Sequence, residues 1–352
     1  MTTLSPGLVT FCIALAASLL LTVPVRALAL RVGMVDLPGP RKVHLKPIPL
    51  LGGLAIYAGF LLAVLLTLGG AARAQTMGIL AGATLVAVVG FLDDRGLLHH
   101  QIKLFGAMPL AGVILLATGV RAHVFDVVLA GRAGVVFDTV LTVFWVVGIT
   151  AAFSILDHMD GLCAGTAGVA SLFFAILAGT AGQRLVSVLA AAVLGSAIGF
   201  LRWNFNPAKI FMGDGGAMFL GFLMAALGLK LRLPGEPSPV AWIVPLLLLG
   251  VPIFDTTLIS ISRGRRGLLP FTSPGKDHTA HRLANLGLGQ RNAVLAVYAL
   301  GFVFGLLGLL ASRLGPRAAG VLALAVGAAG LAGVALLERV PYERQSPKSS
   351  ST

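Results

Sequence analysis

Long apolar stretches separated by short polar segments run along almost the whole chain. A helix that crosses a bilayer needs about 20 apolar residues. Eleven segments approach or exceed that length: residues 6–30, 49–70, 76–92, 102–120, 138–156, 163–181, 184–202, 215–232, 239–261, 291–312 and 316–337. We expect each to be helical, because a helix satisfies its own backbone hydrogen bonds in lipid. The pattern predicts an all-α polytopic membrane protein with about ten to eleven transmembrane helices.

Two segments depart from this pattern. Residues 121–137 hold two runs rich in β-branched and aromatic residues around an Ala-Gly-Arg-Ala-Gly sequence, which predicts a small external β-hairpin. Residues 341–352 are polar and are expected to form a disordered cytoplasmic tail. We expect residues 1–340 to form a single integral-membrane domain.

Composition supports the membrane assignment. Of the 352 residues, 57% are hydrophobic and only 11% are charged, whereas a soluble protein carries roughly 25% charged residues. The net charge of +13 is expected to set topology and attract anionic headgroups or substrates, so no nucleic-acid partner is expected. Cys12 and Cys163 indicate neither a disulfide framework nor a zinc site. The abundant Gly and Ala suit close helix packing and are compatible with a homodimer.

The loop charges predict an orientation. If the first long loop faces the cytoplasm, eighteen of the 26 Lys and Arg residues lie on that side, as the positive-inside rule requires. Ionisable groups near lipid are costly and therefore rare without a function. Yet eight acids fall in polar breaks on this same side: Asp36, Asp93, Asp94, Asp157, Asp160, Asp214, Asp255 and Asp277. This arrangement is typical of a membrane enzyme with a metal site at its cytoplasmic face.

Each polar cluster has a functional and a structural interpretation. Residues 35–53 carry Arg41, Lys42, His44 and Lys46 on a path restricted by prolines and glycines. A topology anchor is the structural alternative. An anchor needs neither a His nor a run of fixed turns, so we favour an anion cradle.

The acidic clusters point to a cation. Asp93 and Asp94 are adjacent carboxylates, which repel each other unless a cation bridges them. Asp157 and Asp160, three residues apart, would share a face of a helix and could reach one metal or nucleotide. Asp214 stands in a Gly-Asp-Gly-Gly sequence just before a helix, which suits a Mg²⁺ ligand beside a phosphate-binding helix N-terminus.

The last polar loop carries histidines. His278 and His281 would share one helical face beside Asp277 and Arg282, which predicts a cluster that faces phosphate. Zinc is not expected, because no supporting Cys or third His accompanies them. We favour a structural hydrogen-bonding role for His158 over a role as base or ligand. Asp255 has the structural alternative of locking a helix end.

Five segments together resemble a known family. They are VDLPGPRKVHLKPIPLLGG (35–53), FLDDRG (91–96), LDHMDGL (156–162), RWNFNPAKIFMGD (202–214) and DHTAHRL (277–283). They are similar to the polyprenyl-phosphate N-acetylhexosamine-1-phosphate transferases, the MraY/WecA-like glycosyltransferase family 4. The resemblance implies an enzyme of ten or eleven helices at the cytoplasmic face of the bacterial inner membrane. Such enzymes transfer a sugar 1-phosphate from a UDP-sugar to undecaprenyl or another polyprenyl phosphate, require Mg²⁺ (Mn²⁺ is the alternative), and release UMP.

The resemblance also implies roles for the matching residues. Asp214 is expected to be the principal metal ligand, with Asp157 as a second. Catalytic roles are implied for Asp93, Asp94, Asp157, His278 and His281, with Asp93 or Asp94 as the candidate general base. Phe211 is expected to stack on uracil, with Asn204 nearby. The full set implied to bind substrate is Lys42, His44, Lys46, Lys103, Asp160, Asn204, Phe211 and Arg282.

The chain departs from the family pattern at three positions. Members usually carry Asn where Ala151 and Ser154 stand, and Gly where His158 stands. The last loop lacks the run of adjacent His of the muramyl-pentapeptide branch. It is closer to the WecA-like branch, which primes O-antigen and other surface glycans with N-acetylglucosamine phosphate or a related sugar. The alternatives are a muramyl-pentapeptide phosphate transferase, a transporter, or a catalytically impaired scaffold.

Overall fold

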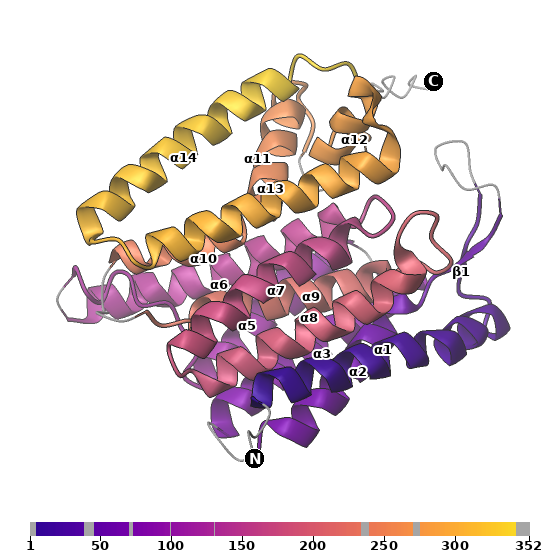
Figure 1. Cartoon of the computed structure of the whole chain (residues 1–352), viewed down its shortest axis with the longest axis horizontal. Helices are drawn as coiled ribbons and strands as arrows, with labels where there is room; N and C mark the ends of the chain where they lie inside the picture. The colour runs from indigo at the N-terminus through magenta and orange to yellow at the C-terminus, as the bar shows by residue number, and fades with distance from the viewer. Residues whose placement is uncertain are drawn as a thin grey trace.

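The computed structural model describes residues 5–38, 46–69, 73–98, 100–129, 131–233, 239–269 and 275–342. Helices dominate these residues (Figure 1). The longer ones are α1 (Pro6–Arg31), α2 (Gly52–Thr67), α3 (Arg73–Asp94), α5 (Met108–Ala117), α6 (Arg132–Leu156), α7 (Leu162–Thr180), α8 (Arg184–Asn204), α9 (Gly213–Lys230), α10 (Ile243–Leu248), α11 (Gly250–Gly264), α13 (Gly289–Ala311) and α14 (Pro316–Leu337). The shorter segments are α4 (His100–Ile102), the π-helical η1 (Lys103–Ala107), the 3₁₀ turn η2 (Pro239–Trp242), α12 (Thr279–Leu283) and the π-helical η3 (Ala284–Leu288).

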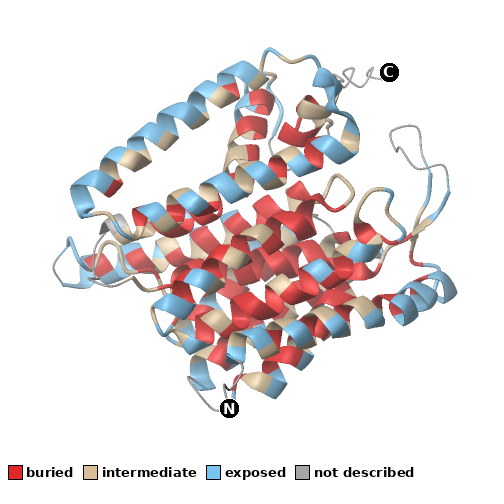
Figure 2. Ribbon diagram, viewed as in Figure 1, coloured by how far each residue is buried: buried red, intermediate tan, exposed pale blue. Residues whose placement is uncertain are grey.

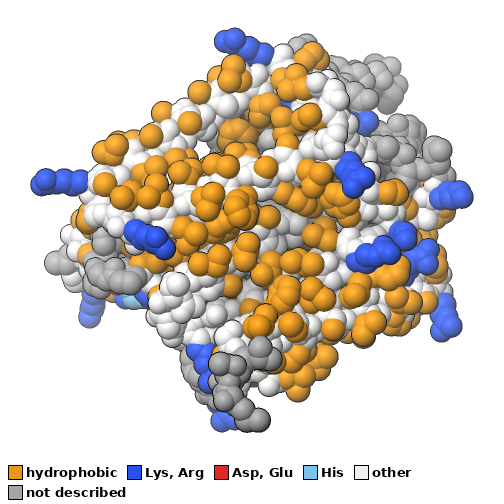
Figure 3. All heavy atoms as spheres, viewed as in Figure 1, with side chains coloured by type: hydrophobic (Ala, Val, Ile, Leu, Met, Phe, Trp, Pro, Cys, Tyr) orange, Lys and Arg blue, Asp and Glu red, His pale blue; other side chains and the backbone are white. Residues whose placement is uncertain are grey.

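The prediction of an all-α polytopic membrane protein is confirmed. Seven helical stretches among the described residues are long and apolar enough to cross a membrane by length and composition. Two shorter apolar helices, 52–67 and 103–117, coincide with two further predicted segments. The last two predicted segments are α9 and the interrupted run η2–α10–α11. Hydrophobic side chains cover most of the face in Figure 3, and Lys and Arg gather towards its edges.

Helix α9 lies at the centre of the bundle. It is buried along nearly its whole length and packs against α2, α3 and α6 (Figure 2). Helix α3 meets it backbone to backbone, since a Cβ atom added at Gly90 would lie 2.6 Å from the Cα of Gly215. Small residues permit such close approach between membrane helices. The contact brings Asp93 and Asp94, one turn beyond Gly90, to the N-terminus of α9.

A small strand ribbon holds the segment before α9. Strands β1 (Val35–Asp36) and β2 (Ile48–Pro49) pair antiparallel. The backbone N–H of Phe211 donates to the carbonyl of Pro49 at 2.8 Å, and the N–H of Gly52 donates to the carbonyl of Phe211 at 2.9 Å. These bonds tie the start of α9 to the start of α2.

The predicted hairpin at 121–137 is wrong. Residues from Arg132 onward belong to α6, and the preceding described residues form turns. The buried carboxylate of Asp138 in α6 accepts the backbone N–H groups of Val124, Phe125 and Asp126 at 2.9 to 3.0 Å. Because one side chain satisfies the N–H groups that a partner strand would have taken, the loop folds onto the helix end instead.

The Gly90 contact predicts a stability difference. Gly90→Ala should destabilise the protein by roughly 1–3 kcal/mol, because the new methyl group meets the backbone of α9. Gly148→Ala is the matched control, since nothing lies within 4 Å of a Cβ atom there. Thermal unfolding in detergent measures both. Equal melting temperatures for the two variants would contradict the backbone contact.

Candidate active site

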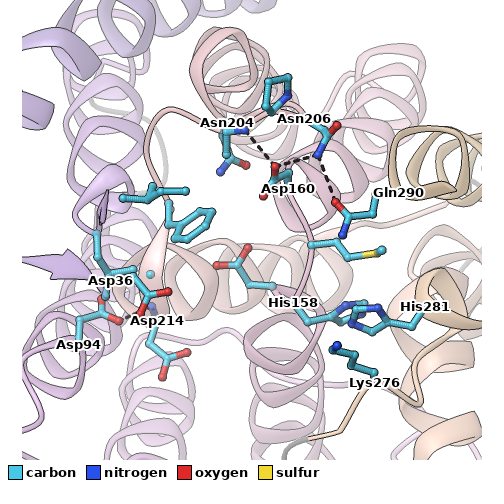
Figure 4. A pocket seen from close by; sticks show the side chains of 18 residues that line it. Asp36, Asp94, His158, Asp160, Asn204, Asn206, Asp214, Lys276, His281 and Gln290 are labelled. Atoms are coloured by element: carbon cyan, nitrogen blue, oxygen red, sulfur yellow. Dashed lines mark hydrogen bonds between the residues drawn. The ribbon is translucent and has the colours of Figure 1, made fainter. Parts of the chain in front are cut away.

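A cavity of about 530 Å³ opens at one end of the bundle, near β1 and α12 in Figure 1. Each of the five segments singled out in the sequence contributes at least one residue to its lining. Figure 4 shows the arrangement: Asp94 and Asp214 lie on one side, His158, Lys276 and His281 on the other, and Asp160, Asn206 and Gln290 on a third. The structure thus brings together polar clusters that are far apart in sequence.

Asp94 caps helix α9. Its two carboxylate oxygens accept the backbone N–H groups of Asp214 and Gly215 at 2.8 and 3.1 Å. Helix N-termini favour such negative charge. Gly213 has φ +76°, and a Cβ atom there would lie 2.5 Å from a carboxylate oxygen of Asp94. Glycine is therefore required for the capped geometry.

Lys103 joins two of the predicted acids. Its Nζ donates to Oδ2 of Asp93 at 2.6 Å and to Oδ2 of Asp214 at 2.5 Å. Ser154 donates its hydroxyl to the other oxygen of Asp214 at 2.9 Å. Lys103 opens the π-helical η1, a distortion that is frequent at functional sites. One ammonium group thus balances two carboxylates, while Asp93 itself stands outside the cavity lining.

Asp157 and Asp160 both line the cavity, but not because they share a helical face. Helix α6 ends at Leu156, and the two acids lie on the connection to α7. Asp160 accepts the side-chain amide of Asn206 and the backbone N–H of Ala208, each at 3.0 Å. Burial, and next the carboxylates that surround it, raises the pKa of Asp157 to about 8. A carboxyl in this state favours a nearby cation.

Asn204 and Phe211 border the cavity in different ways. The amide of Asn204 is buried, accepts the backbone N–H of Gly161 at 3.0 Å and donates to the carbonyl of Ile210 at 2.9 Å. It therefore holds two cavity loops in place. Phe211 lines the cavity from the strand-tied segment before α9.

The histidines form a stack. The ring of His158 lies 3.9 Å from that of His278 and 4.6 Å from that of His281, with interplanar angles of 29° in both pairs. Asp255 pairs with Nδ1 of His278 at 2.8 Å and accepts the backbone N–H of Thr279 at 2.7 Å. His158 and His281 line the cavity, whereas His278 stands behind them. Asp255 thus orients His278 and locks the start of α12.

Among the described residues, one group of ligand atoms lies close enough together to hold a metal. Ligand atoms of His158, Asp255 and His278 lie within 4.8 Å of one another. Both nitrogens of His278 are already engaged, however, and the Arg263 guanidinium lies 3.4 Å from one of them. A cation is repelled there. Asp157 and Asp214 also line the cavity and carry carboxylates, which a hard divalent cation prefers; Lys103 and Ser154 already bond to the two oxygens of Asp214.

Arg282 does not reach the cavity. Its side chain is fully buried and donates to the carbonyls of Asp277 and Leu337, at 2.8 and 2.7 Å, and to Glu338 at 2.6 Å. Its guanidinium also stacks on Tyr342, 4.3 Å from the ring centroid. The residue predicted to face phosphate instead joins α12 to the end of α14. Tyr342 lies at the start of the predicted tail, whose residues 343–352 are outside the described part of the chain.

Asp277 also belongs to this structural joint. It pairs with Arg263 at 2.8 Å and with Arg266. Although burial opposes ionisation, the hydrogen bonds and charge of Arg263 hold the pKa of Asp277 at about 2. Of the predicted phosphate-facing cluster, only His281 lines the cavity.

The anion cradle is described only in part. Lys42 and His44 lie outside the described residues, and Lys46 is exposed and does not line the cavity. Three further residues line the cavity: Asn206, Lys276 and Gln290. The sequence motifs did not identify Lys276 or Gln290 as site residues. Asn206 lay inside a quoted segment, where its contact with Asp160 was not visible in the sequence.

Comparison with known proteins decides the family. Residues 76–232 match the model of glycosyl transferase family 4. A Bacillus subtilis protein named "Probable undecaprenyl-phosphate N-acetylglucosaminyl 1-phosphate transferase" is 38% identical over 298 residues, 84% of this chain and 82% of the relative. This chain belongs to glycosyl transferase family 4.

Further family members agree. A decaprenyl-phosphate N-acetylglucosaminephosphotransferase of Mycolicibacterium smegmatis is 34% identical over 303 residues, 78% of this chain and 74% of the relative. The undecaprenyl-phosphate alpha-N-acetylglucosaminyl 1-phosphate transferase of Escherichia coli is 27% identical over 311 residues, 81% of this chain and 78% of the relative. The family resemblance inferred from the five segments is confirmed.

The position of Arg282 predicts a structural role. Arg282→Gln should destabilise the protein by about 3–5 kcal/mol, because it removes the closer of two cationic partners of Glu338, at 2.6 Å, and leaves buried carbonyls without their donor. Arg265→Gln is the control, since Arg265 is 71% exposed and pairs with the same Glu338 at 3.6 Å. Its effect should stay within about 1 kcal/mol. Thermal unfolding would refute this role if the two variants lost equal stability.

Proposed function

We propose that this protein transfers N-acetylglucosamine 1-phosphate from UDP-N-acetylglucosamine to a polyprenyl phosphate. An oxygen of the lipid phosphate attacks the sugar-linked phosphorus, and the bond from that phosphorus to the bridging oxygen breaks. The products are a lipid diphosphate sugar and UMP. One observation carries the proposal: in a membrane protein of this family, acids and basic side chains face each other across a single cavity at one end of the bundle.

The cavity fits reactants that are both anionic. Phosphoryl transfer depends chiefly on positioning and on charge stabilisation. We assign His281 and Lys276 to the diphosphate, and Phe211 to the uracil ring. Asp160 and Asn204 shape the nucleotide side of the cavity through the loops that they hold together. Lys42, His44 and Lys46 keep their proposed role in attracting anions.

The acidic side fits a divalent cation. Asp214 and Asp157 offer carboxylate oxygens, and the pKa of Asp157 is raised first by burial and then by the neighbouring acids. Mg²⁺ bound there would supply charge neutralisation for the diphosphate. Asp94 and Ser154 hold Asp214 in place. Asp93 or Asp94 is the proposed acceptor of a proton from the lipid phosphate, and Lys103 positions Asp93 beside the site.

We also propose that the cavity faces the cytoplasm at the bacterial inner membrane. The excess of Lys and Arg on the loops of this side supports that orientation. The location of the acids disfavours a transporter, because transporters place ionisable groups near the bilayer midplane. Ser154 contacts Asp214 where family members usually carry Asn. This contact supports an active enzyme over an impaired scaffold.

Asp214 provides the first test of this function. Asp214→Asn should lower turnover by about 100-fold or more, because it removes a charge placed to act on the transferring group. Labelled UDP-N-acetylglucosamine and undecaprenyl phosphate, supplied to the purified protein, measure lipid product. Asp126→Asn is the matched control, since Asp126 pairs with Arg121 outside the cavity lining. Full activity of the Asp214 variant would remove this residue from the site.

Metal dependence provides a second test of the proposed function. EDTA should abolish turnover, and Mg²⁺ should restore it. Because Asp157 keeps its proton below pH 8, Mg²⁺ must displace that proton to bind. Its apparent affinity should therefore rise up to about tenfold per pH unit towards pH 8 and level off above it. Thermal stabilisation by Mg²⁺ at several pH values measures this. A pH-independent affinity would exclude Asp157 as a ligand.

A further inference from the structure

His158 has buried polar atoms without partners. Both ring nitrogens are shielded from solvent, and neither has a hydrogen-bond partner among the described residues. A buried polar group left in this state costs about 1–3 kcal/mol, so native structures rarely contain one without a reason. Because His158 lines the cavity, a bound substrate is the available source of the missing partner.

The ring is held in one orientation. His278 and His281 both pack against it, and their own ring centroids lie 6.2 Å apart. His278 is itself held by Asp255 at Nδ1 and approached by Arg263 at Nε2. The His158 ring is therefore packed on two sides by protein rings, while both of its nitrogens remain without a partner among the described residues. A donor that is already oriented loses little freedom on binding.

The surroundings indicate the chemistry of that ligand. His158 stands beside Lys276 and His281, on the side of the cavity that faces Asp94 and Asp214 (Figure 4). An imidazole carries at least one N–H in every protonation state. Phosphoryl oxygens are strong acceptors, and charged acceptors give the stronger hydrogen bonds. A metal is a poorer occupant, because the nitrogens of the neighbouring His278 are already engaged.

We propose that His158 is a phosphate-binding residue whose ring N–H donates to a phosphoryl oxygen of the substrates. The oxygen belongs either to the diphosphate of the UDP-sugar or to the lipid phosphate. This inference rests on the proposed function. It assigns a substrate contact to a position where family members usually carry Gly, and it gives His278 the task of positioning the His158 ring.

Three variants of the full-length protein test the proposal. His158→Phe keeps a stacking ring and removes both nitrogens. His158→Gln restores an N–H donor without the ring. His123→Phe is the matched control, because His123 pairs with Asp126 outside the cavity lining. The measurements are Kd for UDP-N-acetylglucosamine and for UDP without lipid present, KM for undecaprenyl phosphate, and the melting temperature.

The phosphate contact predicts a specific pattern. His158→Phe should melt close to the wild type, but its Kd or KM for one substrate should rise about 10-fold or more. His158→Gln should recover part of the loss, and His123→Phe should change nothing. A higher Kd for both UDP-N-acetylglucosamine and UDP assigns the contact to the nucleotide diphosphate. A higher KM for the lipid alone assigns it to the lipid phosphate.

Other results would overturn the proposal. Unchanged constants in His158→Phe would mean that the ring only packs. Weaker binding of UDP-N-acetylglucosamine with unchanged binding of UDP would mean that the ring contacts the sugar. The proposed function fails separately, if the wild-type protein neither binds UDP-sugars nor forms a lipid diphosphate.

Discussion

The balance of charge at the N-terminus of α9 is the constraint on which the rest of the site depends. Carboxylates packed together within a membrane bundle repel each other and lose solvation. Here the backbone N–H groups of α9 hold Asp94, and the ammonium of Lys103 lies between Asp93 and Asp214. Both arrangements need α3 and α9 in direct contact, which Gly90 permits. The helix packing thus gathers Asp93, Asp94 and Asp214 at the N-terminus of α9.

The opposite wall is built by a different device. Asp255 in α11 orients His278, and the stacked rings carry that order to His158 at the cavity. The buried joint of Arg282, Glu338 and Asp277 fixes α12 behind them. Two walls of different chemistry therefore face each other across the cavity. Positioning of this kind is what phosphoryl transfer asks of a protein.

The sequence predicted more of this fold than of the side-chain partners. Eleven apolar segments correspond to helices, because a membrane demands long apolar helical runs. The prediction of a hairpin at 121–137 was wrong because its apolar, β-branched residues also suit the start of a membrane helix. In addition, Asp138 accepts hydrogen bonds from the backbone of the loop. Arg282 resembled a phosphate ligand because its partners, Leu337 and Glu338, lie 55 and 56 residues away in the sequence. His158 looked like an isolated histidine until tertiary contacts placed it in a stack.

The identity of the leaving nucleotide tests the central claim most directly. Purified protein in nanodiscs would receive UDP-N-acetylglucosamine and undecaprenyl phosphate, with lipid and nucleotide products identified by mass. The account predicts undecaprenyl diphosphate N-acetylglucosamine and UMP in equal amounts. Release of UDP together with a lipid monophosphate sugar would contradict it, because the sugar would then have moved without its phosphate. Absence of any lipid product with active lipid and donor would contradict it as well.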